Sequence, residues 1–339
     1  MIMVTGATGH IGNVLVRKLL SMGKKVRIFA WDKEDLKPVE GLDIEITKGD
    51  LGNLNALVQS FEGVDTVYHL AGMISIVPGK YKELYQTNVE GTKNVIKACL
   101  KTGVRRLVYV SSIHAIKEPP RGTTITEDLP FDKERVKGDY AKTKAIASYE
   151  VLAAAQAGMD AVIACPTGVI GPFDYRVSEM GQLVLNFIRG KFKISVKGAY
   201  DFVDVRDVAR GLILISEGGK AGEKYILSGH YITVTELLGM LADIIGKPAP
   251  VVQMPVFLAR VAGVFATPFY KLTGSKPLFT AYSIDVLNSN AIVSSEKARH
   301  ELGYTTRPIR ETLEDAVYWF SQYIKGLQKI NTNRSFCPI

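Results

Sequence analysis

Cysteine is scarce in this chain, and its few cysteines are not arranged for pairing. Only three occur among 339 residues, Cys99, Cys165 and Cys337, and none belongs to a CxxC pair. An odd number of widely spaced cysteines argues against a disulfide framework and against a zinc site, so we expect free thiols and no metal. This pattern favours a reducing compartment, and we expect a cytoplasmic protein.

Long apolar runs are missing too. No stretch of about 18 uninterrupted apolar residues is present, so we expect no membrane span. The first residues lead directly into a glycine-rich turn, which leaves no room for the regions of a signal peptide. One nearly apolar segment, residues 255–270, is interrupted by Arg260. It is consistent with burial in a small lobe, with a lipophilic substrate pocket, or with peripheral contact to a membrane surface.

Clusters of basic residues are also absent. Lys and Arg number 42 against 34 Asp and Glu, which gives a net charge of +8. Part of this excess lies near the C-terminus, on Lys325, Lys329 and Arg334, and the rest is scattered. Scattered charge is typical of a solvated surface, so we expect a small anionic cofactor or substrate as partner and no nucleic acid.

The composition, 47% hydrophobic and 22% charged, is ordinary for a globular enzyme. The first half of the chain alternates β-rich runs with helical patterns, which predicts an α/β fold with a Rossmann-type doubly wound parallel sheet. The expected strands are 2–5, 25–30, 44–48, 66–70, 107–110, 160–165 and 223–227. The expected helices are 10–21, 53–60, 84–102, 139–157, 234–245, 256–266, 295–302 and 309–327.

Glycine and proline become frequent after residue 165, where Pro166 is expected to halt a strand. We therefore predict a dinucleotide-binding domain over residues 1–165, with its sheet completed by parts of 200–230. A smaller, mainly substrate-binding lobe is expected over 166–327. The last residues, 328–339, lack periodicity and are expected to form a loose tail.

A glycine-rich turn, GATGHIG over residues 6–12, follows the first strand and opens the first helix. The first glycine permits a tight turn, the second lets the backbone approach a pyrophosphate, and the third allows close packing of helix and strand. The helix N-terminus then offers free N–H groups to the phosphates. We expect this loop to bind a dinucleotide through Gly6, Thr8, Gly9, His10, Ile11 and Gly12.

The end of the second strand should lie beside the adenosine ribose. There Lys33 or Arg27 could meet a 2′-phosphate, and Asp32 could bind ribose hydroxyls, although plain surface charge is an alternative for each. Asp50, followed by Leu51, could reach the adenine amine or could cap a helix. The residues assigned to this end of the cofactor are Trp31, Asp32, Lys33, Asp50 and Leu51.

Tyr140 and Lys144 are four residues apart, which places both on one face of a helix. A phenol titrates near pH ~10, and a neighbouring ammonium favours its phenolate form. Such a phenol can act as a general acid or base, while Ser112, at a strand end, can share the substrate oxygen. The YxxxK spacing by itself also fits an ordinary exposed helix face.

These motifs together resemble the extended short-chain dehydrogenase/reductases of the NAD-dependent epimerase/dehydratase superfamily, and in particular their dihydroflavonol-4-reductase-like branch. The resemblance covers about residues 1–325. Besides the glycine loop and YAKTK over 140–144, it rests on the segments GDL 49–51, HLAG 69–72, NVEGT 88–92, VSS 110–112, PTGVIGP 166–172 and DFVDVRDVA 201–209.

The resemblance implies a role for each matching residue. Tyr140 would be the general acid/base, Lys144 would lower the pKa of Tyr140 and bind ribose hydroxyls, and Ser112, rather than Ser111, would polarise the substrate oxygen. Asn88 would support the site through its backbone. Leu70, Ala71 and Gly72 would line the nucleotide, Pro166 and Val169 would lie by the nicotinamide, and Asp204 and Arg206 would brace the lobes.

Departures from the family pattern leave the cofactor open between NADP and NAD. Trp31 replaces the arginine of phosphate-preferring relatives, and Ala30 replaces the acid of NAD-preferring ones. Because Lys33 remains and no acid repels a phosphate, the sequence leans slightly to NADP. Ser112 is followed by Ile113 and His114 instead of a Val-Tyr-Gly stretch, which favours a substrate less polar than a nucleotide sugar.

We expect an enzyme that interconverts a carbonyl and a secondary alcohol on a small lipophilic, polyphenol-like or steroid-like substrate. The alternatives are a nucleotide-sugar epimerase or dehydratase and a non-catalytic nucleotide sensor. His114 could touch substrate or simply pack, His69 is expected to be structural, and Cys165 is expected to be buried packing. The helices near 84–102 and 139–157 could pair in a homodimer.

Overall fold

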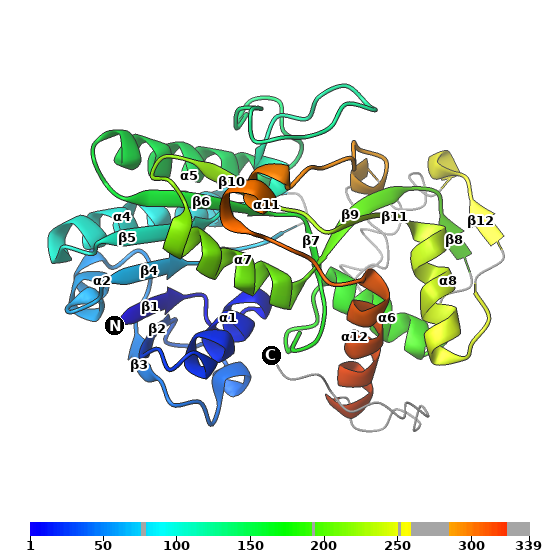
Figure 1. Cartoon of the computed structure of the whole chain (residues 1–339), viewed down its shortest axis with the longest axis horizontal. Helices are drawn as coiled ribbons and strands as arrows, with labels where there is room; N and C mark the ends of the chain where they lie inside the picture. The colour runs from blue at the N-terminus through cyan, green and yellow to red at the C-terminus, as the bar shows by residue number, and fades with distance from the viewer. Residues whose placement is uncertain (76–78, 192–193, 250–251, 259–284, 324–339) are drawn as a thin grey trace.

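The computed structural model describes residues 1–339 except 76–78, 192–193, 250–251, 259–284 and 324–339 (Figure 1). Its central feature is a seven-stranded sheet of order β10-β6-β5-β4-β1-β2-β3, in which every pairing is parallel. The predicted Rossmann-type sheet is therefore confirmed. Its strands are β1 (Ile2–Thr5), β2 (Val26–Ala30), β3 (Glu45–Lys48), β4 (Thr66–His69), β5 (Arg106–Val110), β6 (Ala161–Pro166) and β10 (Lys224–Leu227).

Both faces of this sheet are covered by helices, which explains why its central strands are almost wholly apolar. Successive side chains of a strand point to opposite faces, so Met3 joins one core cluster and Val4 the other. The Met3 side is covered by α2 (Leu54–Phe61), α4 (Gly91–Thr102) and α5 (Asp139–Gln156). The Val4 side is covered by α1 (His10–Ser21), α7 (Val205–Gly218) and α11 (Glu296–Leu302) (Figure 1).

A second group of elements has its own apolar core, in which Phe187, Leu241 and Phe320 come from three different helices. These helices are α6 (Glu179–Ile188), α8 (Val234–Ile245) and α12 (Ile309–Tyr323). A three-stranded sheet joins β7 (Gly168–Ile170), β9 (Ala199–Asp204) and β11 (His230–Thr233), and a smaller one joins β8 (Ile194–Val196) and β12 (Val252–Met254). The division of the chain into two domains at residue 165 stays a prediction.

Most expected elements appear within a residue or two of their predicted bounds. The strand β6 ends at Pro166, as expected, but it includes the proline itself, opposite Leu227 of β10. Pairing of β6 with β5 has already ended at Ala164, so the missing N–H of Pro166 breaks no ladder there. Seven further elements, α6, α7, β7, β8, β9, β11 and β12, were not among the predicted ones.

The predicted helix 84–102 is divided into three parts. The structure has α3 (Tyr81–Tyr85), a π-helical turn over Gln86–Glu90, and then α4. Of the predicted helix 256–266, only residues 256–258 are described, and they are helical. The end of the helix expected to reach residue 327 and the expected loose tail lie outside the described residues. None of the described helices is long and apolar enough to cross a membrane.

Candidate active site

The turn between β1 and α1 is shaped for close approach of a ligand. Gly6 has a φ of +71°, and a Cβ on it would lie 2.6 Å from the backbone nitrogen of Ala71. A Cβ on Gly12 would lie 2.1 Å from the carbonyl oxygen of Gly6, whereas one on Gly9 would meet only that oxygen, at 3.2 Å. Gly9 is also the N-cap of α1, with no capping side chain and no acid in the first turn. The loop therefore fits the diphosphate of a dinucleotide.

The residues at the end of β2 are exposed, as a ligand-facing corner requires. Trp31 is 48% exposed, and the amine of Lys33 lies over its ring, 5.8 Å from the centroid. Arg27, in contrast, points away from this role: its guanidinium donates to Glu45 and to the carbonyl oxygens of Ser60 and Glu62. The structure thus favours the surface-charge interpretation for Arg27. Lys33 remains a candidate for contact with a 2′-phosphate.

Asp50 does not cap helix α2, which was one of its two interpretations. The cap is Asn53, whose side chain accepts from the backbone N–H of Ala56 at 3.2 Å. Asp50 instead accepts from the N–H of Gly52 at 2.7 Å, which fixes the turn after β3. Leu51 is partly buried beneath this turn and packs against the core.

The segment after β4 lies between the glycine loop and Asn88. The backbone N–H of Ala71 donates to Thr5 Oγ1 at 3.2 Å, while a Cβ on Gly72 would lie 3.2 Å from Asn88 Oδ1. Leu70 packs against the core on the α1 side. Residues 70–72 are therefore in reach of the nucleotide path that the resemblance implies.

Asn88 joins three parts of the site through its side chain. It is buried in the π-helical turn, accepts from the N–H of Met73 at 2.7 Å and donates to the Met73 carbonyl at 3.0 Å. Its amide also donates to Thr143 Oγ1 at 3.0 Å, and Thr143 donates to the carbonyl of Tyr140 at 2.9 Å. The support expected from the backbone of Asn88 thus extends through its side chain to the catalytic helix.

His69 forms a buried link between β1 and the π-helical turn. Its Nδ1 lies 2.7 Å from Thr5 Oγ1, and its Nε2 lies 3.0 Å from Thr92 Oγ1. Since Thr92 donates its own proton to the carbonyl of Asn88, at 2.6 Å, the ring must carry its proton on Nε2. Burial, with the nearby charge of Lys144, lowers the pKa of His69 to about 3. The ring is therefore neutral and structural, as predicted.

The two serines after β5 have different partners. Ser111 Oγ lies 2.7 Å from Ser148 Oγ, and Ser148 donates to the carbonyl of Lys144 at 2.8 Å, so Ser111 is the donor of the first bond. Ser112 accepts from the backbone N–H of His114 at 3.2 Å. The proton of the Ser112 hydroxyl can therefore be donated to a substrate oxygen, while that of Ser111 is committed to α5.

Lys144 is held by the strand that carries these serines. Its side chain is buried, its Nζ donates to the carbonyl of Val110 at 2.5 Å, and the amine lies 4.4 Å from the centroid of the Tyr109 ring. Burial lowers the pKa of Lys144 to about 7. Burial, and next the charge of Tyr140, raise the pKa of Tyr109 well above its usual value. Lys144 thus lies against the Tyr109 ring, and Tyr140, four residues earlier on α5, belongs to the same face of the helix.

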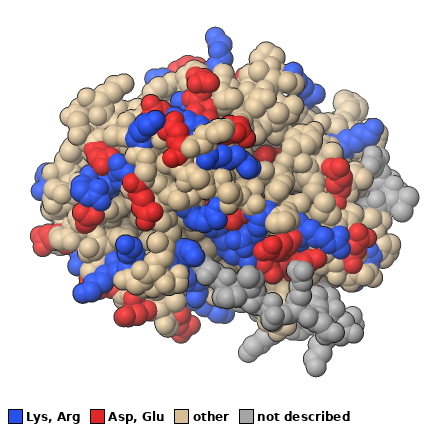
Figure 2. Space-filling model, in the orientation of Figure 1, with Lys and Arg blue, Asp and Glu red and all other residues tan. Residues whose placement is uncertain are grey.

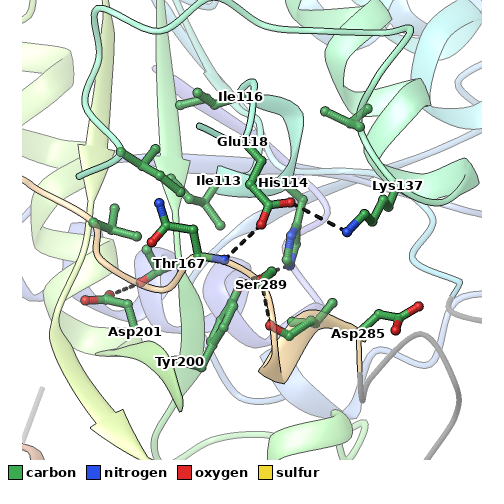
Figure 3. Close-up of a pocket in the computed structure, with 15 residues that line it drawn as sticks. Ile113, His114, Ile116, Glu118, Lys137, Thr167, Tyr200, Asp201, Asp285 and Ser289 are labelled. Carbon is green, nitrogen blue, oxygen red and sulfur yellow. Dashed lines mark hydrogen bonds and ion pairs between the residues drawn. The ribbon is translucent and has the colours of Figure 1, made fainter. Parts of the chain in front are cut away.

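A pocket opens beside these residues (Figure 3). The ring of His114 stacks on that of Tyr200, with Nε2 2.9 Å from the phenol oxygen. Burial lowers the pKa of His114 to about 4, so this ring is neutral. Figure 3 shows the carboxylate of Glu118 directed towards Lys137, and the two charged groups lie 4.0 Å apart. His114 thus packs against Tyr200 and also lines the pocket, and its contact with a substrate stays a prediction.

The segment expected beside the nicotinamide reaches this pocket at Thr167. Thr167, between Pro166 and Val169, lines it and donates to Asp201 at 2.6 Å. Val169 lies on β7, paired with β9. Cys165, just before them, is fully buried, and burial raises the pKa of its thiol to about 12, in agreement with packing. Within the described ranges, no group of three or more His, Cys, Asp or Glu is placed to hold a metal ion.

Asp204 and Arg206 form a brace between α7 and α12. Arg206 is buried and pairs with Asp204 at 2.8 Å and with Asp315 of α12 at 2.7 Å. Arg307 adds a contact of 3.1 Å to Asp207. These charges satisfy one another, and neither Asp204 nor Arg206 lines the pocket.

The fold and this site define a Rossmann-type enzyme with a dinucleotide loop and a Ser–Tyr–Lys arrangement. The sequence model of the NAD dependent epimerase/dehydratase family matches residues 2–228. The chain is 35% identical over 322 residues to Sterol demethylase protein B of Methylococcus capsulatus, covering 94% of this chain and 98% of that protein. It therefore belongs to the NAD dependent epimerase/dehydratase family, and the predicted extended short-chain dehydrogenase/reductase type is confirmed.

Other similarities agree with this assignment. The chain is 33% identical over 324 residues to a Synechocystis sp. protein with the provisional name dihydroflavonol 4-reductase, covering 94% of each chain. The crystal structure of gox2253 is 32% identical, with a TM-score of 0.84, covering 97% of this chain and 99% of that one. MoeE5, solved with UDP-glucuronic acid and NAD, is 25% identical, with a TM-score of 0.76, covering 95% and 99%. The chain is thus an oxidoreductase of an NAD-binding family.

Proposed function

We propose that this enzyme interconverts a carbonyl and a secondary alcohol on a small lipophilic, polyphenol-like or steroid-like substrate, using NADP or NAD. The observation that carries the proposal is the position of Lys144. Its amine is held 2.5 Å from the carbonyl of Val110, two residues before Ser112, on the helix that also carries Tyr140. The strand end carries a hydroxyl donor and the helix carries an acid/base and a cation, which supports their acting on one substrate oxygen.

The bound nicotinamide would supply or accept the hydride. Around it, Ser112 donates its hydroxyl proton to the substrate oxygen, and Tyr140 gives a proton to that oxygen or removes one. The ammonium form of Lys144 favours the phenolate of Tyr140. The diphosphate would lie on Gly6, Gly9 and the N-terminus of α1.

The walls of the pocket support a substrate with a large apolar part. Ile113, Ile116 and Ile125 line it, together with Val136, Val286 and Val293. A relative of Arabidopsis thaliana, 28% identical over 300 residues, is named 3beta-hydroxysteroid-dehydrogenase/decarboxylase isoform 1. Its name and that of Sterol demethylase protein B favour a steroid-like substrate.

A nucleotide-sugar epimerase or dehydratase is the second candidate, because MoeE5 was solved with a nucleotide sugar and NAD. Such an enzyme would retain tightly bound NAD and show no net oxidation or reduction. A non-catalytic sensor would bind nucleotide and turn over nothing. The presence of the whole set of Ser112, Tyr140 and Lys144 favours an enzyme.

The deciding experiment is a turnover assay with the purified protein. Steroid, flavonoid and simple ketones and alcohols are offered with NADPH, NADH, NADP⁺ or NAD⁺, and UDP-glucose is offered in parallel. We expect cofactor-dependent absorbance change at 340 nm with an apolar substrate. Conversion of the nucleotide sugar without net redox change would replace the proposal, and binding of cofactor without any turnover would favour the sensor.

We also propose a cytoplasmic homodimer formed by α4 and α5. Leu100 on α4 is 62% exposed and Tyr149 on α5 is 42% exposed, so each helix presents an apolar side chain that such an interface would bury. Light scattering after size exclusion tests it, and a monomer would contradict it. Of the segment 255–270, residues 259–270 lie outside the described residues, and Phe257 and Leu258 are exposed.

A further inference from the structure

One loop of the second group of elements lies across the first helix of the dinucleotide fold. It runs over residues 171–178, between β7 and α6. His10 Nε2 lies 2.9 Å from the carbonyl oxygen of Pro172, and Asn13 Nδ2 donates to the carbonyl of Phe173 at 3.1 Å. The guanidinium of Arg17 lies over the Phe173 ring, 5.2 Å from its centroid. The start of the loop is therefore fastened to α1, beside the glycine turn.

The backbone of this loop is unusual on both sides of Arg176. Phe173 and Val177 have positive φ values of 66° and 51°, which non-glycine residues adopt only when the surroundings require it. The far end is fixed by Asp174, whose carboxylate accepts from the backbone N–H and the hydroxyl of Ser178 at 2.8 and 2.6 Å. Arg176 is thus presented from a loop that is anchored at both ends.

Arg176 reaches the glycine turn and meets two groups there. It donates to Thr8 Oγ1 at 2.7 Å and forms an ion pair with Glu34. Thr8 in turn donates to Glu34 Oε1 at 2.8 Å. Thr8 is buried and the Glu34 side chain is 18% exposed, while that of Arg176 is 53% exposed and so remains accessible to a ligand.

These three residues form a corner between the glycine turn and the end of β2, which is where the adenosine ribose of a dinucleotide lies in this fold. The two cofactors differ there alone: NAD presents a ribose hydroxyl, and NADP presents a phosphate. A carboxylate accepts hydrogen bonds from ribose hydroxyls and repels a phosphate. A guanidinium binds a phosphate through two parallel hydrogen bonds.

We propose that Glu34 and Arg176 select the cofactor, a proposal that rests on the dinucleotide site proposed above. With NAD, Glu34 accepts from the ribose and Arg176 keeps its ion pair with Glu34. With NADP, Arg176 leaves Glu34 and binds the 2′-phosphate. Because the two groups neutralise each other in the free protein, the corner admits both cofactors, and Arg176 supplies the preference for NADP.

Equilibrium binding of NADPH and NADH, followed by nucleotide fluorescence, tests the proposal without any substrate. Arg176→Met should weaken NADPH binding about 10- to 100-fold, because a charge-assisted pair of hydrogen bonds is lost. It should change NADH binding less than about 3-fold. Glu34→Gln should act in the opposite sense, weakening NADH and strengthening NADPH. The double variant should bind both with similar affinity.

Lys24→Met is the matched control, since it removes an exposed cation from the opposite end of β2. We expect it to change both affinities by less than about 3-fold. An equal loss of both cofactors in Arg176→Met, no loss at all, or the same selective NADPH loss in Lys24→Met would each overturn the selector. Failure of the wild-type protein to bind either nucleotide would instead overturn the dinucleotide site. A thermal melt of each variant verifies folding.

Discussion

The buried network behind the catalytic residues and the exposed charges of the neighbouring pocket differ in how they are held. From Thr5 through His69, Thr92 and Asn88, hydrogen bonds of 2.6 to 3.0 Å continue within the buried interior. In the pocket, Glu118 and Lys137 approach only to 4.0 Å, and their side chains are 38% and 69% exposed. The geometry of the chemistry is thus fixed by a satisfied buried network, whereas the exposed pair of Glu118 and Lys137 can change at little cost in stability.

Figure 2 shows a related contrast at the surface, where basic and acidic side chains are interspersed over the face in view. Among the described residues, the buried charged groups include the brace at Arg206 and Lys144 of the catalytic helix, and Asp174 and Asp201 are buried as well. Disrupting the brace or Lys144 should have large effects, and changing the pocket should have small ones. The following variants test that difference, from the largest expected effect to the smallest.

Removal of the Tyr140 hydroxyl should have the largest effect. Tyr140→Phe keeps the ring and removes the proton donor, so kcat should fall about 10²- to 10⁴-fold, while NADPH binding stays within about 3-fold of wild type. Steady-state kinetics and fluorescence titration measure the two quantities. Retention of full activity would show that another group transfers the proton.

The two neighbouring serines offer a matched pair. Ser112→Ala removes the donor to the substrate oxygen and should lower kcat about 10²-fold. Ser111→Ala breaks only the bond to Ser148, so it should lower the free energy of unfolding by about 1 kcal/mol and leave kcat within about 3-fold of wild type. Kinetics and urea unfolding separate these outcomes, and a larger kinetic loss in Ser111→Ala would reverse the assignment.

Lys144 should make stability depend on pH. Its pKa in the folded chain is about 7, below its ordinary value of 10.5, so the unfolded chain binds the proton more tightly between these values. The contribution of Lys144 to the free energy of unfolding should therefore rise with pH from about 7 to 10, by at most about 1.4 kcal/mol per pH unit. Below pH 7 the destabilisation is complete.

Lys144→Met tests this dependence because it fills the same space without a charge. In urea unfolding of the cofactor-free protein, the variant should be more stable than wild type at pH 6 and should show a flatter pH dependence up to pH 10. Its turnover should be lost. Parallel pH curves for the two proteins would mean that the lysine is not destabilised by burial.

Substitutions in the pocket should have the smallest effect on turnover. His114→Phe keeps a stacked ring against Tyr200, and because the histidine is neutral no charge is lost. We expect KM to change by up to about 10-fold, with kcat within about 3-fold of wild type. Tyr200→Phe, which removes the same hydrogen bond from the other side, is the control. A loss of kcat as large as that of Ser112→Ala would place His114 in the chemistry.

The catalytic residues could be predicted from the sequence, whereas the contacts that join distant segments could not. The glycine turn, the Ser112 strand end and the spacing of Tyr140 and Lys144 are local patterns, so residue order alone exposes them. The ion pair of Glu34 with Arg176 and the contact of His114 with Tyr200 join residues 142 and 86 positions apart. Periodicity carries no information about such pairs, because they arise only when the loop after β7 meets the glycine turn and when β9 lies beside the segment after β5.

Departures from the sequence interpretation have equally physical causes. The strand β6 ends at Pro166, one residue beyond its expected end, because no partner needs an N–H at that last position. Glu34, which the sequence interpretation did not single out, accepts a hydrogen bond from Thr8 of the glycine turn. Neither outcome follows from residue preferences alone.

At the π-helical turn over Gln86–Glu90, the loss of one residue would change the orientation of the neighbouring helix. A π turn holds one more residue than an α turn, so deletion of a single residue there would convert it to α-helix and rotate α3 by about 100° relative to α4. Asn88 would then lose its reach to Met73 and Thr143 together. An insertion or deletion in a loop changes the length of that loop, whereas a deletion in this turn would change the orientation of α3 relative to α4.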